Sequence, residues 1–308
     1  PRGRGHRAVS SHDEDSITMA VAAARAALAS ACNNAVDTLQ FASTTLPFAD
    51  RQNAGVISEA LSLPETLRTL DVTGSLRCAT SSLVSALISG EKQLLVAADK
   101  RRTQPASTLE LTAGDAGAAV VTGQDDLLAV YLGSHSTTVD MTDHYRAQHA
   151  EFDYHLEERW VREEGLLKII PDTAAQLITS QQLDTGDIAH LIVPGTNKKT
   201  AIAIANRCGI AEAAVSNNLE LECGDSGCAH PLLMFNFALE RAQPGDKILL
   251  VGFGQGCDVL LFEATELVKQ LHTAKPLQSM LDSGADDYNY HRYLSNNQTL
   301  HLALCIPG

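Results

Sequence analysis

The feature that most constrains this chain of 308 residues is an apparent internal duplication of its strand and helix order. A short apolar strand is predicted from Asp37 (DTLQFAST), and a similar strand is predicted from Asp187 (DIAHLIVP). A helix that ends at Gly90 leads into EKQLLVAAD, and a helix that ends near Pro244 leads into GDKILLVGF. Two copies of a strand–helix–strand unit are the economical explanation. Short apolar strands that alternate with helices predict mostly parallel sheets covered on both faces.

The first of these two helices lies in the stretch from Asp71 to Gly90, DVTGSLRCATSSLVSALISG. A strand end, a Gly-Ser turn and a helix are predicted here, and the helix has apolar positions at helical spacing: Leu76, Ala79, Leu83 and Leu87. Cys78 lies in the first turn, where free N–H groups and the helix dipole favour a thiolate. This stretch is therefore a natural place for a cysteine that carries an acyl group.

Composition excludes several classes of function. A net charge of −14 argues against a nucleic-acid-binding protein, which would normally carry a basic patch. No apolar run is long enough to cross a membrane, and we expect no secretory signal. Seven scattered cysteines predict free thiols in a reducing, cytoplasmic setting.

Residues 142–181 are rich in charged and aromatic side chains and are expected to be mostly helical.

Several motifs then agree, in order, with a known family. They are DEDSITMAVAAARAAL, a helix of the type A-C-x-G-x-T-x-x-L, LELTAGDAGAAVV, DHYR and PGDKILLVGFGQG. The chain resembles the thiolase superfamily, and most closely the 3-hydroxy-3-methylglutaryl-CoA synthases and ketoacyl synthase III enzymes. The resemblance implies an α/β protein with the thiolase-like five-layered αβαβα fold, built from two duplicated halves with mixed, mostly parallel sheets. It also implies a homodimer with acyl-CoA as substrate or ligand between the halves, and no other cofactor.

The resemblance divides the chain into three parts. Residues 1–165 would form the N-terminal thiolase-like half, lacking its first strand. Residues 166–268 would form the C-terminal half. Residues 269–308 are polar and resemble an extension toward an absent appended domain.

The family's chemistry needs a cysteine nucleophile, a histidine and an asparagine or second histidine. Matching Thr80 to the family's threonine puts the nucleophile position at Leu76. The histidine position falls on Ile192, two residues before a proline, and the asparagine position falls on Asp225. Cys78 is then the only thiol of the helix that could act as nucleophile. It lies two residues from Leu76, which is about 200° of rotation around a helix, so a small buried core residue is the alternative interpretation.

A second group of chemically capable residues comprises Cys223, Asp225, Cys228 and His230. Their spacing is not one of the familiar zinc patterns, and no metal is expected. The resemblance implies instead that Asp225 and His230 line an acyl pocket together with Phe253 and Gly254 of the turn FGQGC. The alternative is a structural role, in which Asp225 accepts backbone N–H bonds and His230 begins a helix.

Two hypotheses about function follow. The first is an acyl-CoA condensing enzyme or acyltransferase in which the Cys, His and Asn positions have changed. The second is a non-catalytic acyl-CoA-binding or scaffold subunit. The resemblance implies that such a subunit would associate with a thiolase and a zinc-ribbon/OB-fold protein.

Overall fold

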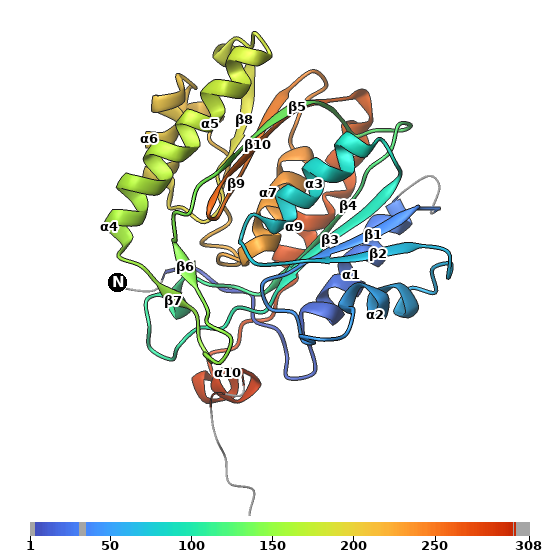
Figure 1. The fold of residues 1–308 in the computed structure, drawn as a ribbon, viewed down its shortest axis with the longest axis vertical. Coiled ribbons are helices and arrows are strands. Elements are labelled where there is room, and N and C mark those ends of the chain that lie inside the picture. The colour runs from blue at the N-terminus through green and yellow to red at the C-terminus, as the bar shows by residue number, and fades with distance from the viewer. Residues whose placement is uncertain (1–3, 31–34, 298, 300–308) are drawn as a thin grey trace, which may run out of the picture.

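The computed structural model describes residues 4–30, 35–297 and 299, and the chain is built around two four-stranded sheets (Figure 1). The strands of the first sheet are β1 (Thr38–Ala42), β2 (Arg68–Val72), β3 (Gln93–Asp99) and β4 (Ala116–Val121). Their order is β2-β1-β3-β4, and only β4 is antiparallel to its neighbour. Every residue of β1 and β3 is buried, as expected for strands covered on both faces.

The second sheet has the order β5-β10-β9-β8. Its strands are β5 (Ala129–Thr138), β8 (Ile188–Ile192), β9 (Lys247–Phe253) and β10 (Gly256–Ala264). β8 and β9 are parallel, whereas β10 is antiparallel to both of its neighbours. The parallel pairs β1–β3 and β8–β9 are the strands that the sequence repeat predicts, and the duplicated mixed sheets are confirmed. Together the two sheets contain equal numbers of parallel and antiparallel pairs, because β4 and β10 run against their neighbours.

The helices form three layers around the two sheets (Figure 1). Those named here are α1 (Ser16–Ser30), α2 (Asn53–Ala60), α3 (Cys78–Ser89), α5 (Leu167–Ser180), α6 (Lys198–Cys208) and α7 (His230–Leu239). The first two pack on the outer face of the first sheet, and α5 and α6 pack on the outer face of the second. α3 and α7 lie between the sheets. The five-layered αβαβα arrangement is therefore confirmed.

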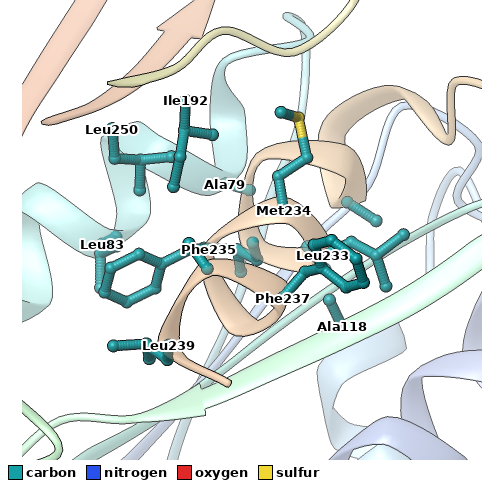
Figure 2. Close-up of a cluster of buried hydrophobic side chains, with 14 of the residues drawn as sticks. Ala79, Leu83, Ala118, Ile192, Leu233, Met234, Phe235, Phe237, Leu239 and Leu250 are labelled. Carbon is teal, nitrogen blue, oxygen red and sulfur yellow. The ribbon is translucent and has the colours of Figure 1, made fainter. Parts of the chain in front are cut away.

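The middle layer holds the largest buried cluster, and Figure 2 shows its centre. Leu233, Phe235 and Phe237 of α7 are all less than 10% exposed. α7 is apolar on all sides because it has a sheet on either face and α3 beside it. Each buried Leu or Phe contributes about 1.5–3 kcal/mol, so this layer fixes the two halves relative to each other.

The expectation of helix through residues 142–181 is wrong in its first half. Within residues 142–157 the chain forms a short hairpin of β6 (His144–Tyr145) and β7 (Tyr154–His155). The helix begins only with α4 (Glu158–Trp160), and it passes through a π-helical turn at Val161–Leu166 into α5. A backbone hydrogen bond from Asp153 N–H to the carbonyl of Arg102 ties the hairpin to the chain that follows β3.

The C-terminal part forms three short helices: α8 (Lys269–Ala274), α9 (Pro276–Asp282) and α10 (Tyr290–Asn296). The carboxylate of Glu240, at the end of α7, accepts the backbone N–H of Leu277 at 2.5 Å and so caps α9. That residues 269–308 lead to an appended domain stays a prediction. No helix within the described ranges is both long and apolar enough to cross a bilayer.

Candidate functional site

The N-terminal end of α3 lies against the turn between β9 and β10. Ser75 Oγ donates to the carbonyl of Gly254 at 2.7 Å, and Arg77 Nε donates to the same oxygen at 3.0 Å. A Cβ on Gly254 would lie 2.7 Å from Ser75 Oγ and 3.0 Å from the backbone N of Leu76, so only glycine allows this approach. The structure therefore places Gly254, one of the expected pocket residues, beside the expected nucleophile position.

Phe253, the neighbouring pocket candidate, packs against the π-helical turn before α5. A Cβ on Gly165 would come within 3.0 Å of the Phe253 ring and within 2.8 Å of Met141. A π-helical turn is uncommon, and a glycine inside a helix lowers its stability. The π-helical turn and Gly165 both lie against the ring of Phe253, where a larger side chain would clash with it.

A buried ion pair anchors the start of α3 to β10. Arg77 Nη1 lies 2.9 Å from Asp258 Oδ1, and the Asp258 side chain is only 1% exposed. The other carboxylate oxygen of Asp258 accepts from the hydroxyls of Thr80 and Ser81. These contacts fix the direction in which the first turn of α3 points.

Cys78 is buried, at 3% exposure, and faces the middle layer. Cys228 is fully buried, and its Sγ donates to the carbonyl of Ala42 at 3.4 Å. Burial, followed by the neighbouring Cys78 thiol and the charge of Asp99, raises the pKa of Cys228 well above its ordinary value. The protonated Cys228 thiol is therefore a poor nucleophile, and the Cys78 side chain is enclosed in the same apolar cluster.

Ile192, the expected histidine position, is fully buried at the end of β8. It belongs to the same apolar cluster as Cys78, Cys223 and Cys228. Burial and the charges of Glu222 and Asp225 raise the pKa of Cys223 to about 12. Ile192 and three of the singled-out cysteines thus belong to one buried apolar cluster.

Asp225, the expected asparagine position, lies on a loop whose backbone is pinned on both sides. Its N–H donates to the carbonyl of Thr112 at 2.8 Å, and its carbonyl accepts from Gly114 N–H at 2.9 Å. Its Oδ1 accepts the N–H of Gly227 at 3.0 Å. The side chain is only half-buried, and Oδ2 lies 3.7 Å from the point that a Cβ on Gly195 would occupy.

His230 is buried at the start of α7, and both ring nitrogens have partners. Nε2 pairs with the carbonyl of Asn218 at 2.8 Å, and Nδ1 pairs with Ser226 Oγ at 3.2 Å. The ring therefore ties the loop to the helix. Within the described ranges, no three His, Cys, Asp or Glu side chains are placed to share a metal ion.

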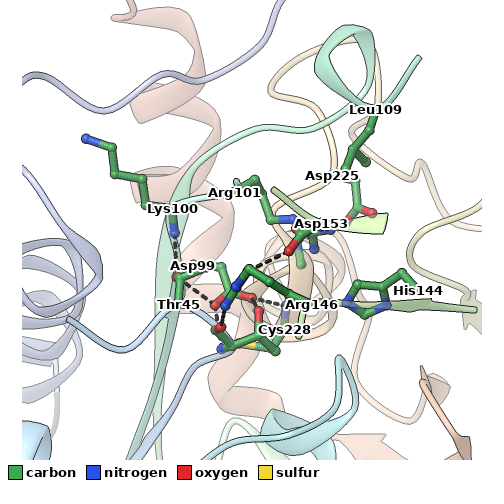
Figure 3. A network of polar contacts seen from close by, with 12 residues as sticks. Thr45, Asp99, Lys100, Arg101, Leu109, His144, Arg146, Asp153, Asp225 and Cys228 are labelled. Carbon is green, nitrogen blue, oxygen red and sulfur yellow. Dashed lines mark hydrogen bonds and ion pairs between the residues drawn. The ribbon is translucent and has the colours of Figure 1, made fainter. Parts of the chain in front are cut away.

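Near Asp225 lies a network of charged residues that sequence reasoning missed, shown in Figure 3. Arg101 follows β3, and its side chain is 2% exposed; Nη2 lies 3.5 Å from Asp153 Oδ2. Arg146 pairs with the other carboxylate oxygen of Asp153 at 2.5 Å. Burial alone would lower the pKa of Arg101, but the charges of Asp225, Asp153 and Asp99 outweigh it and raise that pKa.

Asp99, at the carboxyl end of β3, is the second centre of this network. Its carboxylate accepts five hydrogen bonds, from Ser43, Thr44, Thr45 and the N–H of Cys228. The only sequence signal was a run of charged residues, Asp99 to Arg102, at the end of a largely apolar strand. Carboxyl ends of parallel strands are where polar side chains of a site collect.

Two further histidines lie at different places. His144, in the DHYR motif, is 3.1 Å from Asp143, and its ring is 5.5 Å from that of His155, close to the network. His190, in β8, is 3.3 Å from Asp246. It borders a cavity of about 280 Å³ between β8, α7 and α9. That cavity does not include Leu76, Cys78 or Asp225.

Comparisons with known proteins agree with one another. A family model for the C-terminal part of 3-oxoacyl-[acyl-carrier-protein] synthase III matches residues 178–260. A hydroxymethylglutaryl-CoA synthase from Thermococcus sibiricus is 30% identical over 260 residues, which cover 81% of this chain and 74% of that protein.

Two solved structures show the same fold at lower identity. An HMG-CoA synthase complexed with CoA has a TM-score of 0.79 and 17% identity, covering 89% of this chain and 76% of that one. The 3-oxoacyl-(acyl carrier protein) synthase III of Pseudomonas aeruginosa PAO1 has a TM-score of 0.73 and 22% identity, covering 84% and 86%.

Proposed function

Because the chain belongs to the hydroxymethylglutaryl-CoA synthase family of the thiolase superfamily, we propose that it binds acyl-CoA thioesters without forming an acyl-enzyme. The protein would hold the thioester between its two halves, as a non-catalytic subunit. A solved relative is described as complexed with CoA, which supports the ligand class.

One observation carries this proposal. The residue at the N-terminal end of α3, beside Gly254, is Leu76, and the only thiol on α3 is buried against Cys228. A thioester carbonyl that approached the end of α3 would meet a branched alkyl side chain. Covalent transfer needs an activated nucleophile at that point, whereas binding does not.

Mass spectrometry of the intact protein after incubation with acetyl-CoA tests the covalent step. We expect no acetyl adduct on the unchanged protein, and we expect calorimetry to detect binding of acetyl-CoA. The variant Leu76→Cys places a thiol at the helix end and should acquire an adduct. An adduct on unchanged protein that disappears in Cys78→Ala would contradict the proposal.

That same result would establish the second candidate function, an acyltransferase with Cys78 as nucleophile. This alternative is favoured by one feature, since Cys78 is the first residue of α3 and so lies where the helix dipole stabilises a thiolate. An outward movement of the first turn of α3 would be needed to expose it.

We also propose that the protein forms a homodimer and associates with a thiolase and a zinc-ribbon/OB-fold protein. Light scattering on the purified protein measures the first, and co-purification with mass-spectrometric identification measures the second. A strictly monomeric protein, or one that never retains a thiolase, would contradict these assignments.

A further inference from the structure

Asp225 presents a charge that is both fixed and accessible. Its backbone is held by Thr112 and Gly114, and its Oδ1 is held by Gly227 N–H. Within the described chain no hydrogen bond reaches Oδ2, which faces Gly195. One oxygen of this half-buried carboxylate accepts no hydrogen bond in the described chain, so its negative charge can attract or repel a ligand group placed beside it.

Arg101 has the opposite character, because its guanidinium is enclosed. Its Nε, Nη1 and Nη2 are all buried, and in the described residues none of them has a hydrogen-bond partner. A Cβ on Gly227 would come within 2.5 Å of Nη1, so the 225–228 loop lies directly over the guanidinium. The guanidinium therefore compensates nearby charges but cannot be reached by a ligand.

The charges of this cluster do not cancel. Arg101 and Arg146 face three carboxylates, those of Asp99, Asp153 and Asp225. Asp99 is saturated by its five hydrogen bonds, and Asp153 is 4% exposed and paired with both arginines. The excess negative charge is thus presented at Asp225, the accessible member (Figure 3).

We propose that Asp225, whose charge Arg101 compensates only in part, makes the site select acyl-CoA thioesters with an uncharged acyl group and reject those with a second carboxylate. This inference rests on the proposed function, because it assumes that the acyl group lies beside Asp225. Gly227 N–H holds the Asp225 side chain, and Arg101 lies beneath the same loop as the nearby positive charge. A second carboxylate within roughly 8 Å of Asp225 should weaken binding about tenfold at the effective dielectric of a half-exposed site.

Calorimetry with acetyl-CoA and malonyl-CoA at low ionic strength tests the selection. The unchanged protein should bind acetyl-CoA about tenfold more tightly than malonyl-CoA. Asp225→Asn should bring the ratio close to one. Glu222→Gln removes the same charge from an exposed position of the same loop and should leave the ratio unchanged. Equal binding by the unchanged protein, tighter malonyl-CoA binding, or a ratio that survives Asp225→Asn would overturn the inference.

The role of Arg101 is tested by its own variants. Arg101→Met should raise the acetyl-to-malonyl ratio, because Gly227 N–H still holds Asp225 and the cluster loses a compensating positive charge. Arg101→Lys keeps the charge and should bring the ratio back toward that of the unchanged protein, which a purely structural role would not require. A ratio unaffected by Arg101→Met would overturn the assignment.

A second measurement separates this inference from the proposed function. The melting temperatures of Arg101→Met, Asp225→Asn and the double variant form a cycle that needs no ligand. The loss of melting temperature caused by Arg101→Met should be smaller in the Asp225→Asn background, because one carboxylate fewer then loses its counter-charge. Additive losses would overturn the pairing. If the losses are coupled but neither thioester nor CoA binds, the proposed function fails while the pairing stands.

Discussion

Arg77→Met is the variant that most directly tests how the site is held. It removes one partner of the Arg77–Asp258 ion pair and leaves a carboxylate that is 1% exposed. Removing one partner of a buried pair costs about 3–5 kcal/mol. Arg77 is itself 14% exposed, and Asp258 keeps the hydroxyls of Thr80 and Ser81. The lower end of that range, about 3 kcal/mol of unfolding free energy, is therefore expected.

Urea unfolding followed by circular dichroism measures this loss as a lower midpoint at an unchanged slope. Arg68→Met is the matched control, because the Arg68–Glu91 pair is exposed on both sides and should contribute less than about 1 kcal/mol. The double variant Arg77→Met/Asp258→Asn should be less destabilised than the sum of the single changes, since no unpaired charge then stays buried. Equal midpoints for Arg77→Met and Arg68→Met would refute the reasoning.

Three further outcomes are expected. Gly227→Ala should lower the free energy of unfolding by about 1–3 kcal/mol, because Gly227 has a φ of +61° and an added Cβ would meet Arg101 and Asp99. Urea unfolding measures this loss, and an unchanged midpoint would contradict it. Burial and the charges of Arg101 and His144 lower the pKa of His155 below its ordinary value of 6.5. The contribution of His155 to folding stability is therefore fully present above pH 6.5 and is lost as the pH falls through its lowered pKa. His155→Gln should reduce the fall of the urea midpoint at acid pH. The same dependence of the midpoint on pH in His155→Gln and in the unchanged protein would count against this role of His155. Iodoacetamide should label Cys78, Cys223, Cys228 and Cys257 only on unfolding, because all four are buried; rapid labelling of any of them in native protein, read by peptide mass spectrometry, would be inconsistent.

Local patterns predicted the layers of this fold well. The strands from Asp37 and Asp187 are apolar runs bounded by turn residues, and the structure makes them the equivalent strands β1 and β8. The spacing of Ala79 and Leu83 predicted the buried face of α3. Such signals depend on neighbours within one helix or strand, so a single sequence contains them.

The hairpin of β6 and β7 was missed because its stability comes from elsewhere. The rings of Tyr145 and Tyr154 pack in a tilted arrangement with their centroids 5.3 Å apart, and the hairpin is tied to the segment after β3 by the hydrogen bond from Asp153 N–H to the carbonyl of Arg102. Charged and aromatic residues at this density are compatible with an exposed helix. Tertiary contacts decided the outcome, and they cannot be read from local propensity.

The candidate site was predicted only in part for the same reason. Gly254 lies where the motif places it, against the start of α3. Arg101 and Asp99 carry no motif, and Asp99 reaches Cys228 across 129 residues of sequence. Burial makes these charges important, and burial is a property of the assembled halves.

The hydrogen bonds of Asp99 link the two halves of the chain. Donors from the segment after β1 and from the start of α7 converge on one carboxylate, so neither segment can move without breaking a buried charge-assisted bond. The 225–228 loop is further held by Arg101 beneath it and by Thr112 and Gly114 beside it. A site ordered before the ligand arrives loses little affinity to conformational entropy on binding. The Arg77–Asp258 ion pair likewise opposes the outward movement that Cys78 would need to reach a thioester, and this favours the binding role over the covalent one.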